Sequence, residues 1–331
     1  MRAAILHELN APLAVEEVEC GALEFGQVRV RVLCSGICGA QLQEIRGEKG
    51  GPLPHLLGHE GCGIVEEIGV GVSRVAVGAK VVMHWRKAAG IESPLPRYKI
   101  RGEWRESGRV TTFAEQSICS ENRLTPVPPD TDPELCALLG CSLSTALGTV
   151  EQEARWGDNA LVVGAGGLGM AMLASIHLGA PATVCCCDIH ESKRDSTRPH
   201  VDRYFNLVDE PLTGSYDVIY DTAGAVPTTE DALQRLAPGG RYVMIGQPPP
   251  EKPVCIRWAR HMFDGEGKSI RATQGGGFRP DMDIPRYLAI ADQLFTGNLI
   301  THRMPLDRIN GAISLVQQGE AGRVLLQISD Q

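Results

Sequence analysis

The first third of the chain has the alternation of apolar and polar positions that is typical of β-strands. Residues 28–33 alternate with a period of two, as a half-buried strand does. Residues 61–80 are rich in glycine and valine, which predicts short strands joined by tight turns. Residues 86–109 are polar and contain two prolines, so we expect a surface excursion there, and the prolines within 126–129 mark a linker-like crossing.

The pattern changes near residue 143, where apolar strands begin to alternate with helices. Alternation of this kind predicts a parallel sheet that is covered by helices on both faces, as in doubly wound α/β proteins. The expected strands are 160–163, 182–187, 217–220 and 241–245, and the helices between them are 168–178 and 228–236. After about residue 277 the pattern predicts two helices, 285–295 and 306–318, and a final strand, 324–328.

Composition narrows the class of protein. A chain of 331 residues, of which 43% are apolar and 22% charged, is typical of a globular protein with about two domains. The net charge of −8 argues against nucleic acid or an anionic membrane as the main partner. The N-terminal apolar run ends at His7, too early for a signal peptide, and no apolar stretch reaches the ~18 residues of a membrane span. We therefore expect a cytoplasmic protein.

The cysteines are numerous for such a protein. Eleven cysteines without a secretory signal indicate reduced thiols, of which some are metal ligands. Residues 185–187 are three consecutive cysteines inside an apolar, strand-like run, and we interpret them as small buried hydrophobic residues.

A glycine motif follows the strand at 160–163. Residues 164–169 fit the pattern G-x-G-x-x-G, and here the pattern follows a strand and opens a helix. Gly164 permits the tight turn, Gly166 lets the backbone approach a pyrophosphate, and Gly169 lets the helix lie close to the strand. The phosphate charge then faces the positive end of the helix. The motif predicts a dinucleotide-binding domain.

The acidic residue that ends the next strand indicates which dinucleotide the domain binds. Asp188 lies nineteen residues after Gly169, where a carboxylate can accept hydrogen bonds from the ribose 2′-hydroxyl and would repel a 2′-phosphate. The prediction is therefore NAD rather than NADP. Lys193 lies just beyond, either in contact with the adenosine end or as a plain solvated charge.

Three potential metal ligands lie in the first 141 residues. Two thiolates and an imidazole, from Cys38, His59 and Cys141, would leave a fourth tetrahedral position open, which is the pattern of catalytic zinc. Zinc in such a site polarises an alcohol and lowers its pKa toward neutrality. Spacing alone does not select these three residues from eleven cysteines and nine histidines.

The order of motifs does select them. Gly-Ile-Cys at 36–38, Gly-His-Glu at 58–60, Gly-Cys-x-x-x-Thr at 140–145 and the glycine motif resemble the zinc-dependent medium-chain alcohol dehydrogenases over essentially the whole chain. The stretch 58–65 is close to the zinc-site signature of that family. The resemblance implies one catalytic zinc per subunit, with Cys38, His59 and Cys141 as ligands and Glu60 as an acidic neighbour that approaches the metal.

The resemblance also assigns residues around the cofactor. It implies that Thr145 lies beside the nicotinamide ring and that Leu168, next to Gly167 in the motif, lies behind it. The backbone around Gln274 matches the stretch that binds the carboxamide, and Ile245 matches the strand end beneath the nicotinamide ribose. Arg323 matches a C-terminal arginine that reaches the cofactor phosphates.

The family architecture sets the expected domains. The resemblance implies a GroES-like, β-rich catalytic domain formed by residues 1–142 and 277–331, with a Rossmann NAD-binding domain at 143–276 inserted between them. The active site would lie in the cleft between the two domains. The resemblance also implies a homodimer or a homotetramer, formed by pairing of the nucleotide domains.

Two departures from the family pattern stand out. Residues 81–118 contain no cysteine, so we do not expect the second, structural zinc that some relatives bind in this region. Ala40 and Gln43 occupy the positions of the usual hydroxyl and histidine of the proton relay, and Gln41 stands where an acid is expected beside the zinc-bound histidine. The proton must leave by another route. His84 and Glu60 are the two candidate residues for this route, and direct release to solvent is the third possibility. For His84, the alternative is a pocket-wall or structural role.

The sequence says less about the substrate and the class of function than about the cofactor and the metal. The residues around 84–87 and 110–113 resemble bacterial members that oxidise sugar or cyclitol hydroxyls in biosynthetic pathways, including those of antibiotics. Polar residues at 41, 43, 44 and 84 favour a secondary hydroxyl of a sugar, aminosugar or aminocyclitol, which would become a ketone. Two alternatives remain: a zinc-free NAD(P)H-dependent quinone or enoyl reductase of the same fold, and a non-enzymatic, nucleotide-sensing descendant.

Overall fold

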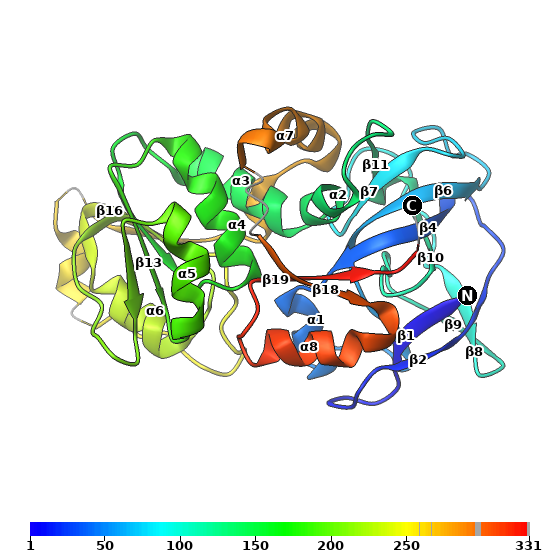
Figure 1. The fold of residues 1–331 in the computed structure, drawn as a ribbon, viewed down its shortest axis with the longest axis horizontal. Coiled ribbons are helices and arrows are strands. Elements are labelled where there is room, and N and C mark those ends of the chain that lie inside the picture. The colour runs from blue at the N-terminus through cyan, green and yellow to red at the C-terminus, as the bar shows by residue number, and fades with distance from the viewer. Residues whose placement is uncertain (258, 266, 295–298, 330–331) are drawn as a thin grey trace.

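The computed structural model describes residues 1–257, 259–265, 267–294 and 299–329. It has two lobes side by side (Figure 1), and both chain termini lie in the β-rich lobe. The elements up to the cleft are β1 (Arg2–Leu6), β2 (Ala14–Glu17), β3 (Glu19–Cys20), β4 (Gln27–Gly36), α1 (Gly39–Ile45), β5 (His55–Leu56), β6 (Glu60–Ile68), β7 (Lys80–His84), β8 (Arg97–Ile100), β9 (Glu103–Glu106), β10 (Gln116–Ser120), η1 (Glu121–Arg123), β11 (Leu124–Pro126) and α2 (Pro133–Leu139).

The second lobe and the C-terminal return complete the chain. Their elements are α3 (Ser142–Glu153), β12 (Asn159–Val163), α4 (Gly167–Ile176), η2 (His177–Gly179), β13 (Thr183–Asp188), η3 (Glu191–Lys193), α5 (Arg194–Thr197), η4 (Arg198–His200), β14 (Arg203–Asn206), β15 (Tyr216–Asp221), α6 (Val226–Leu233), β16 (Leu236–Met244), η5 (Ala259–Phe263), β17 (Ser269–Ala272), η6 (Gly275–Gly277), α7 (Pro280–Leu294), β18 (Ile300–Pro305), η7 (Leu306–Arg308), α8 (Ile309–Gln317) and β19 (Arg323–Gln327).

The β-rich lobe is built from both ends of the chain. Its main sheet has the strand order β11-β7-β6-β4-β19-β18, with β10 also paired to β4. β19 runs antiparallel to β4, with Leu326 opposite Ser35, and β18 runs parallel to β19. The C-terminal strands thereby lie beside the strand that leads into Cys38. The domain limits at 142/143 and 276/277 stay a prediction.

The surface excursion expected at 86–109 is more ordered than the polar sequence indicates. It contains the hairpin β8–β9, and β3 pairs with β8 to complete a three-stranded sheet. Tyr98 and Ile100 point from β8 into a buried apolar cluster. Likewise, the short strands expected at 61–80 are mostly one long strand, β6, followed by turns at Gly71 and Gly78, both of which have positive φ.

The second lobe is the doubly wound parallel sheet that the sequence predicts. Its order is β14-β13-β12-β15-β16-β17, and all of its neighbouring strands are parallel. The strand order turns back at β12, so that the loop after β12 opens at the carboxyl edge of the sheet, where ligands bind in such folds. The expected α/β class is therefore confirmed: a Rossmann-type parallel sheet is joined to a β-rich lobe that both chain ends form.

One of the buried hydrophobic clusters spans both lobes. Helices α2 and α3 contribute Leu139, Leu143 and Leu147, which are buried in a cluster that extends from Val82 of β7 to Val162 of β12. This cluster thus holds β7 of one lobe close to β12 of the other, the strand that leads into the glycine loop. Among the described residues, no single helix is long and apolar enough to cross a membrane, and α2 and α3 meet the length and hydropathy criteria only as a bent pair.

Two predicted elements begin five residues earlier than expected. The strand expected at 241–245 begins earlier, at Leu236, and passes through Pro238 to Gly240 with a shift of register against β15. The helix expected at 285–295 begins earlier, at Pro280, and the Asp283 carboxylate accepts the backbone N–H of Arg279 in its first turn (2.6 Å). Its expected last residue, Phe295, lies outside the described residues.

Candidate metal centre and cofactor cleft

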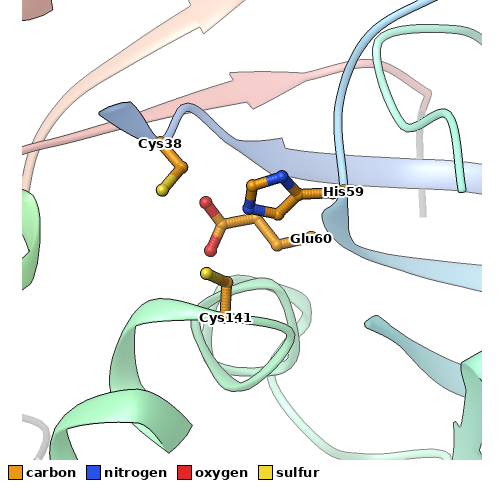
Figure 2. A group of neighbouring side chains, drawn as sticks. All are labelled: Cys38, His59, Glu60 and Cys141. Atoms are coloured by element: carbon orange, nitrogen blue, oxygen red, sulfur yellow. The ribbon is translucent and has the colours of Figure 1, made fainter. Parts of the chain in front are cut away.

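Four predicted residues converge at the junction of the lobes. Cys38 immediately precedes α1, Glu60 begins β6 with His59 just before it, and Cys141 immediately precedes α3. One ligand atom from each lies within 4.8 Å of the corresponding atoms of the others. Figure 2 shows the four side chains pointing toward a common space. Within the described chain, this is the one group of His, Cys, Asp and Glu residues that meets the spacing for a metal ion.

The protonation of the cluster suits a soft divalent metal. A hydrogen bond with the Cys141 thiol, and then the nearby His59 ring, hold the pKa of the Cys38 thiol well below its usual value. The same hydrogen bond, together with burial, raises the pKa of Cys141. Nε2 of His59 is buried and has no hydrogen-bond partner. A thiolate, a second sulfur that shares its proton and a free imidazole nitrogen are the donor set that zinc prefers, so the residues present fit the metal.

Gln41 links two of these residues. Its Oε1 accepts the backbone N–H of Cys38 (2.9 Å), and its Nε2 lies 2.6 Å from Nδ1 of His59. An amide nitrogen donates to Nδ1, whereas a neutral histidine that binds a metal through Nε2 carries its proton on Nδ1 and needs an acceptor there. Metal binding to neutral His59 therefore requires the Gln41 amide to turn over, which gives up the bond to Cys38.

Glu60 forms an ion pair with a residue outside the cluster, Arg323. One of its carboxylate oxygens accepts from the Arg323 guanidinium, and both residues are buried. The other oxygen, Oε2, has no partner. Arg323 in turn lies against Gly167, since a Cβ on that glycine would be 3.0 Å from Arg323 Cδ. The arginine thus connects the cluster with the glycine loop of the other lobe.

The cluster opens into a cavity of about 750 Å³ between the lobes, a size typical of ligand sites. Cys38, His59 and Cys141 form part of its wall. The cavity is also lined by all of the residues that the sequence assigns to the cofactor, namely Thr145, Gly164, Gly166, Gly167, Leu168, Gly169, Asp188, Lys193, Ile245, Gln274 and Arg323. The predicted metal ligands and the predicted cofactor residues therefore face the same space.

Each glycine of the loop has a different environment. Gly164 has φ +90°, which only glycine adopts readily, and a Cβ on Gly169 would meet the carbonyl oxygen of Gly164 at 1.9 Å. Gly166 has an ordinary φ of −74°, and a Cβ there would have no heavy atom within 4 Å. The backbone geometry of the loop therefore requires glycine at 164 and 169, whereas the open space beside Gly166 is part of the cavity.

Asp188 and Lys193 form a buried pair at the far end of the cavity. The Asp188 carboxylate accepts the backbone N–H of Ala165 (2.7 Å) and that of Ile189 (2.7 Å), and Lys193 Nζ lies 3.4 Å from it. Lys193 is therefore not a plain solvated charge, which was one of the two expectations for it. The carboxylate ties the glycine loop to the end of β13.

Comparisons with known proteins agree with this geometry. Residues 24–129 match the family model of the alcohol dehydrogenase GroES-like domain. The zinc-binding alcohol dehydrogenase domain protein from Burkholderia ambifaria superposes with a TM-score of 0.91 at 22% identity, over 99% of each chain. Benzyl alcohol dehydrogenase from Acinetobacter calcoaceticus gives 0.88 at 20% identity, over 99% of each. A zinc-binding dehydrogenase from Sinorhizobium meliloti bound to NADP gives 0.81 at 21% identity, over 98% of each.

The chain has the fold of a medium-chain alcohol dehydrogenase. Residues 24–129, which include Cys38, His59 and Glu60, carry the GroES-like domain of that family.

For His84, the relay role is wrong and the structural alternative holds. Its side chain is fully buried and does not line the cavity. Nδ1 lies 2.6 Å from the carbonyl oxygen of Arg86, and Nε2 lies 3.0 Å from Thr125 Oγ1, so both ring nitrogens are engaged. Burial lowers the pKa of His84 to about 4. His84 is a structural histidine at the end of β7 and is not placed to carry a proton from the site.

Sequence reasoning missed several residues of the cavity wall. His55, Lys49 and Arg109 all line the catalytic side of the cavity. Arg109 pairs with Glu92 (2.6 Å), which the polar composition of this region alone could not show. For His55 there was a signal: it lies four residues before His59, in the segment that delivers that residue to the cluster.

Proposed function

We propose that the chain is an NAD-dependent, zinc-containing alcohol dehydrogenase that oxidises a secondary alcohol to a ketone. The observation that carries this proposal is the convergence of Cys38, His59 and Cys141 on the same cavity as an open glycine loop. Hydride transfer requires the carbinol carbon and the nicotinamide ring to meet in one site, and this cavity offers room for both.

The residues have separable tasks in this proposal. Cys38, His59 and Cys141 would hold the zinc, which supplies Lewis-acid polarisation of the alcohol when bound. Thr145 and Ile245 line the cavity where the nicotinamide would lie. Arg323 holds the Glu60 carboxylate and stands beside Gly167, so it orients that acid and offers its charge to the cofactor phosphates.

Asp188 supports NAD over NADP. The carboxylate stands at the end of β13 and is held by backbone N–H groups, so its charge is fixed where the adenosine ribose binds in this fold. A 2′-phosphate would meet this charge, although Lys193 offsets part of it. The Sinorhizobium relative is bound to NADP, so the alternative is a real one for this fold.

For the substrate, we propose a hydroxyl of a sugar, aminosugar or aminocyclitol. Gln43, Glu44 and His55 give the catalytic side of the cavity hydrogen-bonding groups that suit a polyhydroxylated molecule better than a long aliphatic alcohol. Lys49 and Arg109 line the same side, so the wall carries more basic than acidic groups. Among the three proposed classes, a neutral sugar therefore fits this wall better than an aminosugar or an aminocyclitol does.

Two further proposals concern the state of the protein. Strand β17 ends the parallel sheet, and all four of its residues are exposed, which suits edge-to-edge pairing with a second copy into a homodimer or homotetramer. All eleven cysteines are free thiols, which suits the cytoplasm.

The test combines metal content with a screen of alcohols. Purified protein should contain about one zinc per chain and reduce NAD faster than NADP. Among benzyl alcohol, 2-butanol, sorbitol, myo-inositol and glucosamine, we expect a polyol to give the highest kcat/KM. A higher value for 2-butanol than for every polyhydroxylated compound would contradict the substrate proposal. Full activity without bound metal would instead favour the zinc-free reductase of the same fold.

A further inference from the structure

The two relay positions of the family pattern carry residues that do not pass on a proton. Oxidation of an alcohol to a ketone releases a hydride from carbon, which NAD accepts, and a proton from oxygen. Ala40 and Gln43 line the cavity at the start of α1, and neither a methyl group nor an amide exchanges a proton at neutral pH. His84 is buried away from the cavity. With His84 excluded, the proton needs another acceptor, and Glu60, which is predicted for this task, already pairs with Arg323 through one carboxylate oxygen.

His55 is a histidine in the cavity wall that no other part of the proposed mechanism uses. It lies on β5, whose partner strand β1 fixes its backbone through the pairing of His55 with Leu6. The side chain is half-buried, and its Nδ1 is buried without a hydrogen-bond partner. Its Cε1 lies 3.6 Å from the position that a Cβ on Gly108 would occupy. The ring therefore lies beside Gly108, which also lines the cavity.

We propose that His55, assisted by Glu44, is the proton-relay residue of this enzyme, in place of the missing residues at positions 40 and 43. The inference rests on the proposed alcohol oxidation. The alcohol proton passes through water in the cavity to a free nitrogen of the His55 ring, and the imidazolium then releases it to bulk water. One proton enters and one leaves, so the imidazole is regenerated in each turnover.

The charges around His55 suit this role. Burial lowers the pKa of His55, and the nearby carboxylate of Glu44 on α1 opposes that shift. The ring is therefore neutral at pH 7 and able to accept a proton, and Glu44 stabilises the imidazolium that forms. Of the basic groups on the same wall, Arg46 is paired with Glu48 and Arg109 with Glu92. Lys49 is exposed to solvent.

The experiment compares zinc-loaded wild type with three variants, using the best alcohol of the screen. His55→Gln removes the proton acceptor. His55→Gln combined with Gln43→His places an imidazole at the position that relatives use, and His302→Gln is a matched control on β18, outside the cavity lining. Rates are measured from about pH 5 to pH 9, the range in which an imidazole changes charge.

We expect His55→Gln to lower kcat at pH 7 by about 100-fold, which is the lower end of what a positioned acid–base group contributes. The wild-type rate should fall on acidification as His55 becomes protonated, at a pH lower than is usual for an imidazole because burial lowers the pKa of His55. This acidic limb should be absent in His55→Gln. The double variant should recover at least part of kcat, and His302→Gln should match wild type. Recovery separates a relay function from a merely structural one.

A second readout does not depend on turnover. Diethyl pyrocarbonate, which acylates neutral and accessible imidazoles, should modify His55 and not His84, as located by mass spectrometry of the digested protein. The relay would be ruled out by an unmodified His55, or by an unchanged pH profile and kcat in His55→Gln. Failure of the wild type to reduce NAD with any alcohol would instead overturn the proposed function.

Discussion

At the scale of single residues, the position of a proton or a hydrogen bond decides the chemistry of the site. Gln41 is the clearest case, because it occupies a buried position between Cys38 and His59 where only an acceptor can serve both neighbours once a metal is bound. An amide offers one acceptor and one donor atom, whereas a carboxylate offers two acceptors. The residue at position 41 therefore tunes how tightly the cluster holds a metal.

We predict that Gln41→Glu, which has the same length, strengthens zinc binding by about 10-fold or more, the scale of such neighbouring-residue effects. The carboxylate accepts from both the Cys38 N–H and Nδ1–H of His59. Competition with a chelator of known zinc affinity measures the change, and Gln43→Glu, on the same helix but outside these contacts, is the control. Equal zinc affinity of wild type and Gln41→Glu would show that the Gln41 amide does not weaken zinc binding.

His84 makes a prediction about acid stability. Its pKa is about 4 in the folded protein and 6.5 in the unfolded chain, so unfolding takes up a proton between these values. The free energy of unfolding should therefore fall as the pH drops from 6.5 to 4, by at most about 3 kcal/mol from this residue. Urea unfolding of wild type and His84→Gln at pH 7 and pH 4.5 measures it. A variant that loses as much stability as wild type on acidification would contradict the assignment.

At the scale of elements, the sequence predicts the Rossmann strands well because their apolar runs are regular and separated by clear turn residues. The predictions fail where packing extends an element past local turn residues. The helix before Pro238 does end, at Leu233, but β16 already begins at Leu236 and passes through Pro238 to Gly240, because a shift of register against β15 absorbs the extra residues. The β8–β9 hairpin was missed because its strands are mostly polar, and only Tyr98 and Ile100 are buried.

The glycine loop between β12 and α4 gives a prediction that separates folding from binding. Gly169→Ala should destabilise the protein, because its Cβ would overlap the carbonyl oxygen of Gly164. Gly166→Ala should leave the unfolding transition unchanged, because its Cβ projects into open space, but should weaken NAD binding where the pyrophosphate approaches. Thermal unfolding and NAD titration of both variants test this pair. Normal NAD affinity in Gly166→Ala would contradict the assignment of this loop to the cofactor site.

At the scale of the whole molecule, function depends on how the two lobes meet. The cluster residues come from β-rich segments and from the helix that enters the second lobe, and Arg323 returns from the C-terminal strand to pair with Glu60. The motifs of the sequence identified these residues through resemblance, since spacing along the chain says nothing of distances across 263 positions. His55 and the misplaced His84 show the limit: only the folded lobes reveal which histidine faces the cavity.

X-ray absorption at the zinc edge of the zinc-loaded protein tests the metal site most directly. We predict about one zinc per chain, with two sulfur atoms at about 2.3 Å and a nitrogen at about 2.0–2.1 Å, and loss of the metal in Cys38→Ser. Absence of bound zinc, a shell of four sulfur atoms, or full zinc retention in Cys38→Ser would contradict the site formed by Cys38, His59 and Cys141.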